Sequence, residues 1–226
     1  MSALAVALAV QVSWGLAQPA AAARAEDLRP PPSAAVVRLA AIGEPVALSK
    51  ALMLWLQAFD WQTGTQVPYR TLNYAHVIAW LDRMIDLDPG GQYPLMAASR
   101  LYADIDDPIR TRQMIAFVER AFRDDPNQRW PWLAHVTLLA KHRLKDLPLA
   151  RELAATLQRN TTAAHVPLWA TQMEAFILED MNEFEAARIM IGGLIASGQV
   201  KDERDALLLQ RRLEALDAKL KGAKLP

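Results

Sequence analysis

The sequence contains no cysteine, which excludes disulfide bonds, thiolate zinc sites and a cysteine nucleophile. The absence fits a reducing and an oxidising compartment equally well. The chain also lacks an excess of either charge, because 25 lysine and arginine residues balance 25 aspartate and glutamate residues. Without a positive field to attract phosphates, we do not expect nucleic acid as a partner.

The common motifs of enzyme active sites are absent as well. The sequence has no G-x-S-x-G nucleophile elbow and neither of the glycine-rich loops that hold nucleotide phosphates. His135 and His142 have a helical spacing, but no acidic residue completes a metal-ligand pattern. Asp107 precedes Pro108, so we interpret it as a helix cap rather than a calcium ligand. We therefore predict a protein that is not an enzyme, with no catalytic residue, metal site or cofactor.

An apolar segment lies near the start of the sequence. No charged residue occurs from Ala3 to Ala23, and small residues at the end of this run suit cleavage by signal peptidase. A run of this length also suffices to span a bilayer, and an ordinary buried helix is a third alternative. No basic residue precedes the run and Arg24 follows it, which opposes export of that flank.

We expect residues 1–25 to be a signal peptide or a membrane anchor, with membrane contact through residues 3–23. Both alternatives place the protein in the cell envelope, periplasmic or anchored in the inner membrane, and leave the side of the membrane open. Residues 26–46 are rich in alanine and proline, and their run of three prolines, 30–32, favours extended backbone. We interpret this region as a linker, with ordered helix beginning near Leu48.

The rest of the sequence repeats itself with a period of 37 residues. Apolar stripes at helical spacing recur after this shift, and so does a proline that follows one of them. Alanine and leucine, both strong helix formers, supply much of the 52% hydrophobic fraction. The corresponding residues include Val77 and Met114, Trp80 and Phe117, Leu81 and Val118, and Pro89 and Pro126.

Each repeat is predicted to form two helices, and the stripes continue through four units. A ninth helix near the C-terminus carries leucines on one face and charged residues outside it, as the end of a helical array requires. The predicted helices are 47–59 with 72–87, 93–104 with 108–123, 130–143 with 148–159, and 167–179 with 183–196, followed by 202–221.

Residues 95–102 resemble the first helix of a tetratricopeptide repeat. In that family a large residue is followed by two small residues and then by an aromatic one, as in Leu95, Ala98, Ser99 and Tyr102. The resemblance implies an all-α chain that forms a right-handed superhelical solenoid of about four helix pairs plus a C-terminal capping helix. The repeats would occupy residues 47–200, and the capping helix and tail residues 201–226.

The resemblance also implies a concave groove lined by first-helix positions that flank the packing residues. Such a groove binds another protein as a helix or an extended segment. The corresponding residues of this chain are Tyr93, Met96, Arg100, Trp130, Leu133, Thr137, Lys141 and Glu174.

We therefore expect a non-enzymatic interaction scaffold that supports the assembly or organisation of a cell-envelope complex. The alternative is an accessory subunit of an inner-membrane complex, retained by its N-terminal helix. In that case the apolar helix 48–59 would lie against lipid or a neighbouring subunit.

Overall fold

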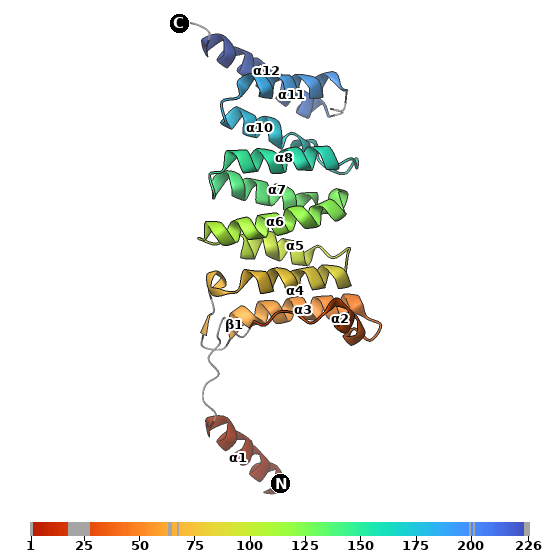
Figure 1. Ribbon diagram of the computed structural model, residues 1–226, viewed down its shortest axis with the longest axis vertical. Coiled ribbons are helices and arrows are strands. Elements are labelled where there is room, and N and C mark those ends of the chain that lie inside the picture. The colour runs from red at the N-terminus through yellow and green to blue at the C-terminus, as the bar shows by residue number, and fades with distance from the viewer. Residues whose placement is uncertain are drawn as a thin grey trace.

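The computed structural model describes residues 2–17, 28–62, 65–66, 68–198, 200 and 202–223. These residues are almost entirely helical, so the prediction of an all-α chain is confirmed. From α3 to α12 the helices lie side by side in chain order, with their axes across the long axis of the molecule (Figure 1).

The first half of the chain contains α1 (Ser2–Ala17), α2 (Ala34–Ala40), α3 (Pro45–Asp60), α4 (Tyr74–Leu87), α5 (Tyr93–Ala97) and the π-helical turn η3 (Ala98–Tyr102). A two-residue antiparallel strand pair, β1 (Trp61–Gln62) and β2 (Thr65–Gln66), and the 3₁₀ turn η2 (Tyr69–Thr71) connect α3 to α4. The second half contains α6 (Pro108–Asp124), α7 (Pro126–His142), α8 (Leu147–Asn160), α9 (Leu168–Thr171), α10 (Met173–Asp180), α11 (Phe184–Ala196) and α12 (Glu203–Ala223).

These helices fall into the predicted pairs. The first helices are α3, α5 with η3, α7, and α9 with α10, and the second helices are α4, α6, α8 and α11. Each helix packs on the next along the chain, and the pairs also meet through α4 with α6 and α5 with α7. Of the residues in the 37-residue stripes, Val77, Leu81, Met114 and Val118 are fully buried between the helices, and Trp80 is half-buried.

Helix α7 begins four residues earlier than predicted. Asp125 accepts a hydrogen bond from the backbone of Gln128 and caps α7, and Pro126 is its first residue, a position where the missing N–H costs nothing. Pro131 then lies inside the helix and leaves the carbonyl of Asn127 without its usual helical donor. His165 supplies the replacement, with its Nε2 at 2.8 Å from that carbonyl oxygen.

The region predicted as a linker, 26–46, is packed over its described part. Helix α2 lies within it and buries Val37 and Ala41 against Leu87 of α4, and α3 begins at Pro45. The linker interpretation is therefore wrong for residues 28–46, because an alanine-rich stretch still supplies an apolar helix face. Residues 26 and 27, like the predicted cleavage region up to residue 25, lie outside the described residues.

The extended strap formed by residues 28–33 runs along α4. Three side chains of α4, spaced four and three residues apart, bond to its backbone carbonyls, and Leu28 is buried at its start. These bonds join His76 Nδ1 to Leu28 O at 2.7 Å, Trp80 Nε1 to Arg29 O at 2.8 Å and Arg83 Nε to Pro32 O at 3.2 Å. Because prolines cannot donate backbone hydrogen bonds, the strap is held by its carbonyls as acceptors and by the burial of Leu28.

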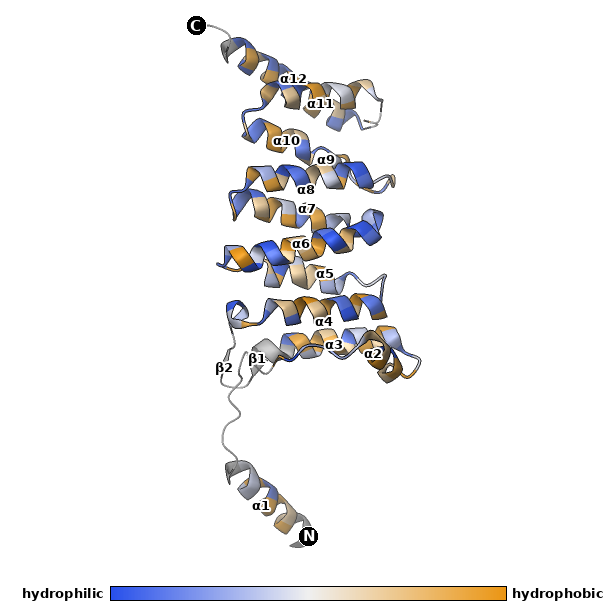
Figure 2. Ribbon diagram, in the orientation of Figure 1, coloured by the Kyte–Doolittle hydropathy of each residue, from blue (hydrophilic) through white to orange (hydrophobic). Residues whose placement is uncertain are grey.

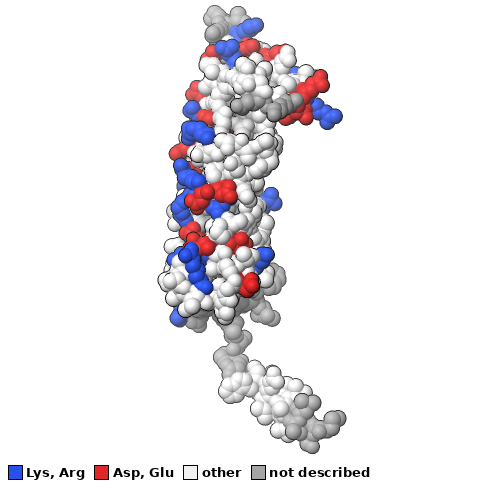
Figure 3. All heavy atoms as spheres, turned by 90° about the vertical axis from the view of Figure 1, so that its right-hand side faces the viewer, with Lys and Arg blue, Asp and Glu red and all other residues white. Residues whose placement is uncertain are grey.

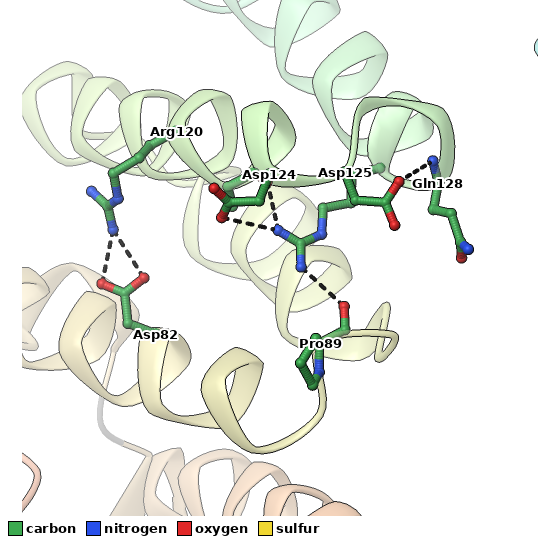
Figure 4. Close-up of polar contacts among 8 residues, drawn as sticks. Asp82, Pro89, Arg120, Asp124, Asp125 and Gln128 are labelled. Atoms are coloured by element: carbon green, nitrogen blue, oxygen red, sulfur yellow. Dashed lines mark hydrogen bonds and ion pairs between the residues drawn. The ribbon is translucent and has the colours of Figure 1, made fainter. Parts of the chain in front are cut away.

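Arg129 links three helices at one point. Its side chain is buried, and its guanidinium donates to the carbonyl of Ala121 at 2.6 Å and to that of Pro89 at 3.0 Å (Figure 4). Asp124 lies 3.4 Å from the same guanidinium. Because carbonyls at helix C-termini carry partial negative charge, the end of α6 and the residues after α4 both stabilise this cation from α7.

We expect Arg129→Met to lower the free energy of unfolding by about 3 kcal/mol, because the buried carbonyl of Ala121 and the partly buried bond to the carbonyl of Pro89 both lose their donor. Arg120→Gln is the matched control, since Arg120 joins α6 to Asp82 of α4 through an ion pair whose side chains are exposed. It should cost less than about 1 kcal/mol. Urea denaturation of both variants measures the difference, and equal losses would contradict the role of Arg129.

Candidate functional site

The first helix of the second pair presents three of the predicted groove residues toward solvent. Tyr93 and Arg100 are exposed and Met96 is half-buried. The hydroxyl of Tyr93 donates to Oε1 of Gln57 on α3 at 2.8 Å, which fixes the ring against the preceding pair. Asp104 is exposed beyond them. Along this helix the residues therefore form one exposed row.

The groove assignment on α7 is wrong for Leu133 and Thr137. Both side chains are completely buried, and the hydroxyl of Thr137 donates to the carbonyl of Leu133. Together with Val136 and Ala140 they form the packed face of α7. The opposite face, which is exposed or half-buried, carries Pro131, His135, Leu138 and His142.

Trp130 and Lys141 lie between these two faces of α7 and contact the fourth pair. The ring of Trp130 meets that of Trp169 edge to face, with centroids 5.6 Å apart. Nζ of Lys141 lies 2.5 Å from a carboxylate oxygen of Asp180. Both residues therefore join one pair to the next, and Lys141, which was predicted to line the groove, is already paired with Asp180.

Glu174 lies on another side of the fourth pair. It is half-buried and accepts a hydrogen bond from Nε of Arg151 on α8 at 3.3 Å. The exposed residues at the two ends of this first helix are Trp169 and Asp180. Glu174 is consequently not part of the row that contains Tyr93 and Arg100.

The error in phase has a simple geometric cause. The turn between α4 and α5 comprises residues 88–92, whereas Asp125 alone separates α6 from α7. Because the two turns differ in length, a fixed shift of 37 residues does not transfer positions correctly from α5 to α7. An error of one residue in this shift moves a position by about 100° around the helix. The spacing of Leu133, Val136, Thr137 and Ala140 could have identified the buried face.

We define the first-helix surface as ten selected exposed or half-buried residues that lie on or directly after the first helices of the second, third and fourth pairs. It combines aromatic, aliphatic and charged side chains, as protein interfaces do. Its members are Tyr93, Met96, Arg100, Asp104, Pro131, His135, Leu138, His142, Trp169 and Asp180.

Charged groups are distributed unevenly over the array. In Figure 3 many lysine, arginine, aspartate and glutamate side chains lie along one edge, and the upper middle of the visible face is largely uncharged. On the first-helix surface Asp104 is paired with Arg143 of the third pair at 2.6 Å. Arg100 forms no ion pair with any residue that the structure describes. It is therefore free to bind an acidic group of a partner.

His135 lies near two charged residues of the second pair, Arg100 and Asp104. Burial lowers the pKa of its imidazole below the ordinary value of 6.5, the nearby Arg100 lowers it further, and Asp104 opposes the shift. No cluster of three or more histidine, aspartate or glutamate side chains suited to a metal ion occurs among the described residues. His135 is thus a half-buried, polar member of the surface.

A cavity of about 670 Å³ lies where α4 and α6 begin. Leu28 of the strap, His76 and Arg110 contribute to its walls. Two of its polar groups already have partners, since His76 bonds to the strap and Arg110 pairs with the capping carboxylate of Asp107. Backbone and side-chain hydrogen bonds from Arg110 lower the pKa of Asp107.

Comparison with known proteins yields no match to a family model, to a curated protein or to a solved structure. Within the described residues, no single helix is long and apolar enough to cross a membrane. The bent pair of Ala34–Ala40 and Pro45–Gln57, with 106° between its two helices, passes that test on length and composition alone.

The shifted pKa of His135 predicts how stability changes with pH. Because protonation is less favourable in the folded state, the unfolded chain binds more protons below about pH 6.5, and the free energy of unfolding falls there. His135→Gln should weaken this dependence in urea denaturation between about pH 7.5 and 5.5. His142→Gln controls for the loss of an exposed imidazole. An unchanged pH dependence in the His135 variant would contradict the assignment.

Proposed function

We propose that the chain is a non-enzymatic scaffold that holds a segment of another protein on its first-helix surface. In this proposal the array is a right-handed, superhelical solenoid of the tetratricopeptide type, with the first helices on its concave side. The helix pairs, the repeat of 37 residues and the polar terminal helix α12 support this arrangement.

The observation that carries the proposal is the composition of the first-helix surface. Tyr93 is 38% exposed, Leu138 43% and Trp169 50%. Each of the three lies on the first helix of a different pair. Large exposed side chains on rigid helices are typical anchors of interfaces, and Arg100 adds a cation without an ion-pair partner in the described chain. A helix or an extended segment with an acidic residue fits this surface.

The strap gives a second, independent support for the kind of ligand. Residues 28–33 are an extended, proline-rich segment that the array holds by side-chain donors at helical spacing on α4. A repeat array that binds its own extended segment by side-chain donors can bind an extended segment of a partner through the same kind of hydrogen bond to backbone carbonyls. The strap packs along α4, which is the second helix of the first pair. It therefore does not cover the first-helix surface.

We place this scaffold in the cell envelope, where it supports the assembly or organisation of a complex. The second candidate is an accessory subunit of an inner-membrane complex, retained through its N-terminal helix. Helix α1 favours both, because it has no charged residue and exposes Val6, Val10 and Trp14.

We expect Arg100→Glu combined with Leu138→Glu to reduce partner capture at least tenfold, about 1.4 kcal/mol, because interface anchors often contribute more than this. Tagged protein is used to capture partners from a membrane fraction, and mass spectrometry quantifies them. Ile109→Glu is the matched control, since this aliphatic residue is exposed on a second helix. Equal recovery of the same partners by the double variant and the wild type would refute the surface.

A further inference from the structure

The two ends of the array differ in the surface they expose. At the C-terminal end α12 presents charged side chains along its length, beside Leu207 and Leu208. At the other end α2 and α3 expose mainly aliphatic side chains, and orange predominates on α2 in Figure 2. These side chains are Val36, Leu39, Ile42, Val46 and Leu54, with exposures of 54, 82, 90, 42 and 65%. We call them the end surface.

The shape of the end surface is a wedge. Helices α2 and α3 meet at 106°, and Ile42 lies in the turn between them. Its backbone has a φ of 48°, a region that β-branched residues rarely adopt. Glycine or asparagine would suit this turn better, and a polar residue would suit solvent better. A strained and exposed isoleucine at the tip of an apolar wedge indicates contact with an apolar medium.

The charge around the end surface favours an anionic partner. Lys50 lies on the exposed row of α3 between Val46 and Leu54, one turn from each. Arg38 is exposed on α2, and Arg29 is exposed in the strap nearby. Glu44, in the turn between α2 and α3, opposes them, whereas Asp86 on the neighbouring α4 is already paired with Arg83 at 3.1 Å. Aliphatic side chains with a cationic rim match the interface of a bilayer that contains anionic lipids.

The connection to α1 makes simultaneous contact feasible. Helix α1 is uncharged and exposed, and its 16 residues extend over about 24 Å, less than the roughly 30 Å of a hydrocarbon core. Ten residues separate it from Leu28, a sequence length that reaches about 35 Å at most. Residues 76–87 of α4, along which the strap and α2 pack, extend over about 16 Å. The connection is therefore long enough for α1 and the end surface to meet one bilayer.

We propose that the end surface rests on an anionic lipid bilayer, with Leu39 and Ile42 entering its interfacial region beside α1. The array then stands with its N-terminal end on the membrane and its first-helix surface accessible from the aqueous side. This inference rests on the membrane location in the proposed function and is independent of the protein-binding surface.

The absence of cysteine from the sequence permits a direct test with single labels. Full-length Leu39→Cys and Ile42→Cys variants carry an environment-sensitive fluorophore and are mixed with vesicles containing phosphatidylglycerol and brominated lipid. We expect a blue shift and quenching at both positions. Ile189→Cys on α11, which is 62% exposed, is the matched control and should show neither change. Val10→Cys reports whether α1 itself enters the bilayer.

Three outcomes would overturn the proposal. Quenching at Val10 without quenching at Ile42 would show that α1 alone contacts lipid, and no quenching at either position would show that neither does. A concentration-dependent blue shift at Ile42 without vesicles, retained when vesicles are added, would assign the surface to a second copy. None of these results affects partner capture by the first-helix surface, so the two proposals fail separately.

Charge provides a second measurement on the same vesicles. Lys50→Gln should weaken vesicle binding about fivefold, the contribution of one cation close to an anionic surface. Arg211→Gln, which removes an exposed cation from α12 at the other end, should leave binding unchanged. Equal effects of the two substitutions, or equal binding of the wild type to phosphatidylcholine vesicles, would contradict the orientation.

Discussion

Burial between neighbouring helix pairs is the constraint on which the whole array depends. A single pair cannot cover the apolar faces of its own helices, so each pair completes the core of the one before it. The polar contacts follow the same rule, because they join residues about one repeat apart: Trp132 with Gln92, Arg129 with Pro89, and Lys141 with Asp180. Stability is therefore local, and opening is expected to begin at the ends.

The sequence predicts the helices well because each one must bury a stripe against the next. The period of 37 identified the pairs, and Val77 and Met114 show why, since each is completely buried on the second helix of its pair. Turn lengths are not encoded in that stripe. The single-residue turn at Asp125 shifted the phase of α7, and the exposed positions predicted at Leu133 and Thr137 are core residues.

The linker shows a different limit of sequence analysis. Prolines 30–32 do favour extended backbone, as predicted, but the carbonyls of Arg29 and Pro32 accept hydrogen bonds from α4 side chains that lie about 50 residues later. Only the folded arrangement brings Trp80 and Arg83 to them. The surfaces proposed for partner and membrane are likewise assembled from separate pairs, which explains why no single motif in the sequence marks them.

In the proposed account the array has two separate binding surfaces. Its N-terminal end contacts lipid, and its first helices bind a protein. The most direct test of the second statement uses a photo-reactive amino acid at Leu138 or Trp169, and in control proteins at Ile109 or Ile189, which are exposed on second helices. After irradiation in native membranes, the account predicts that the captured partner is crosslinked from Leu138 and Trp169 only. Crosslinking of the same partner from Ile109 or Ile189, with none from the first helices, would contradict it.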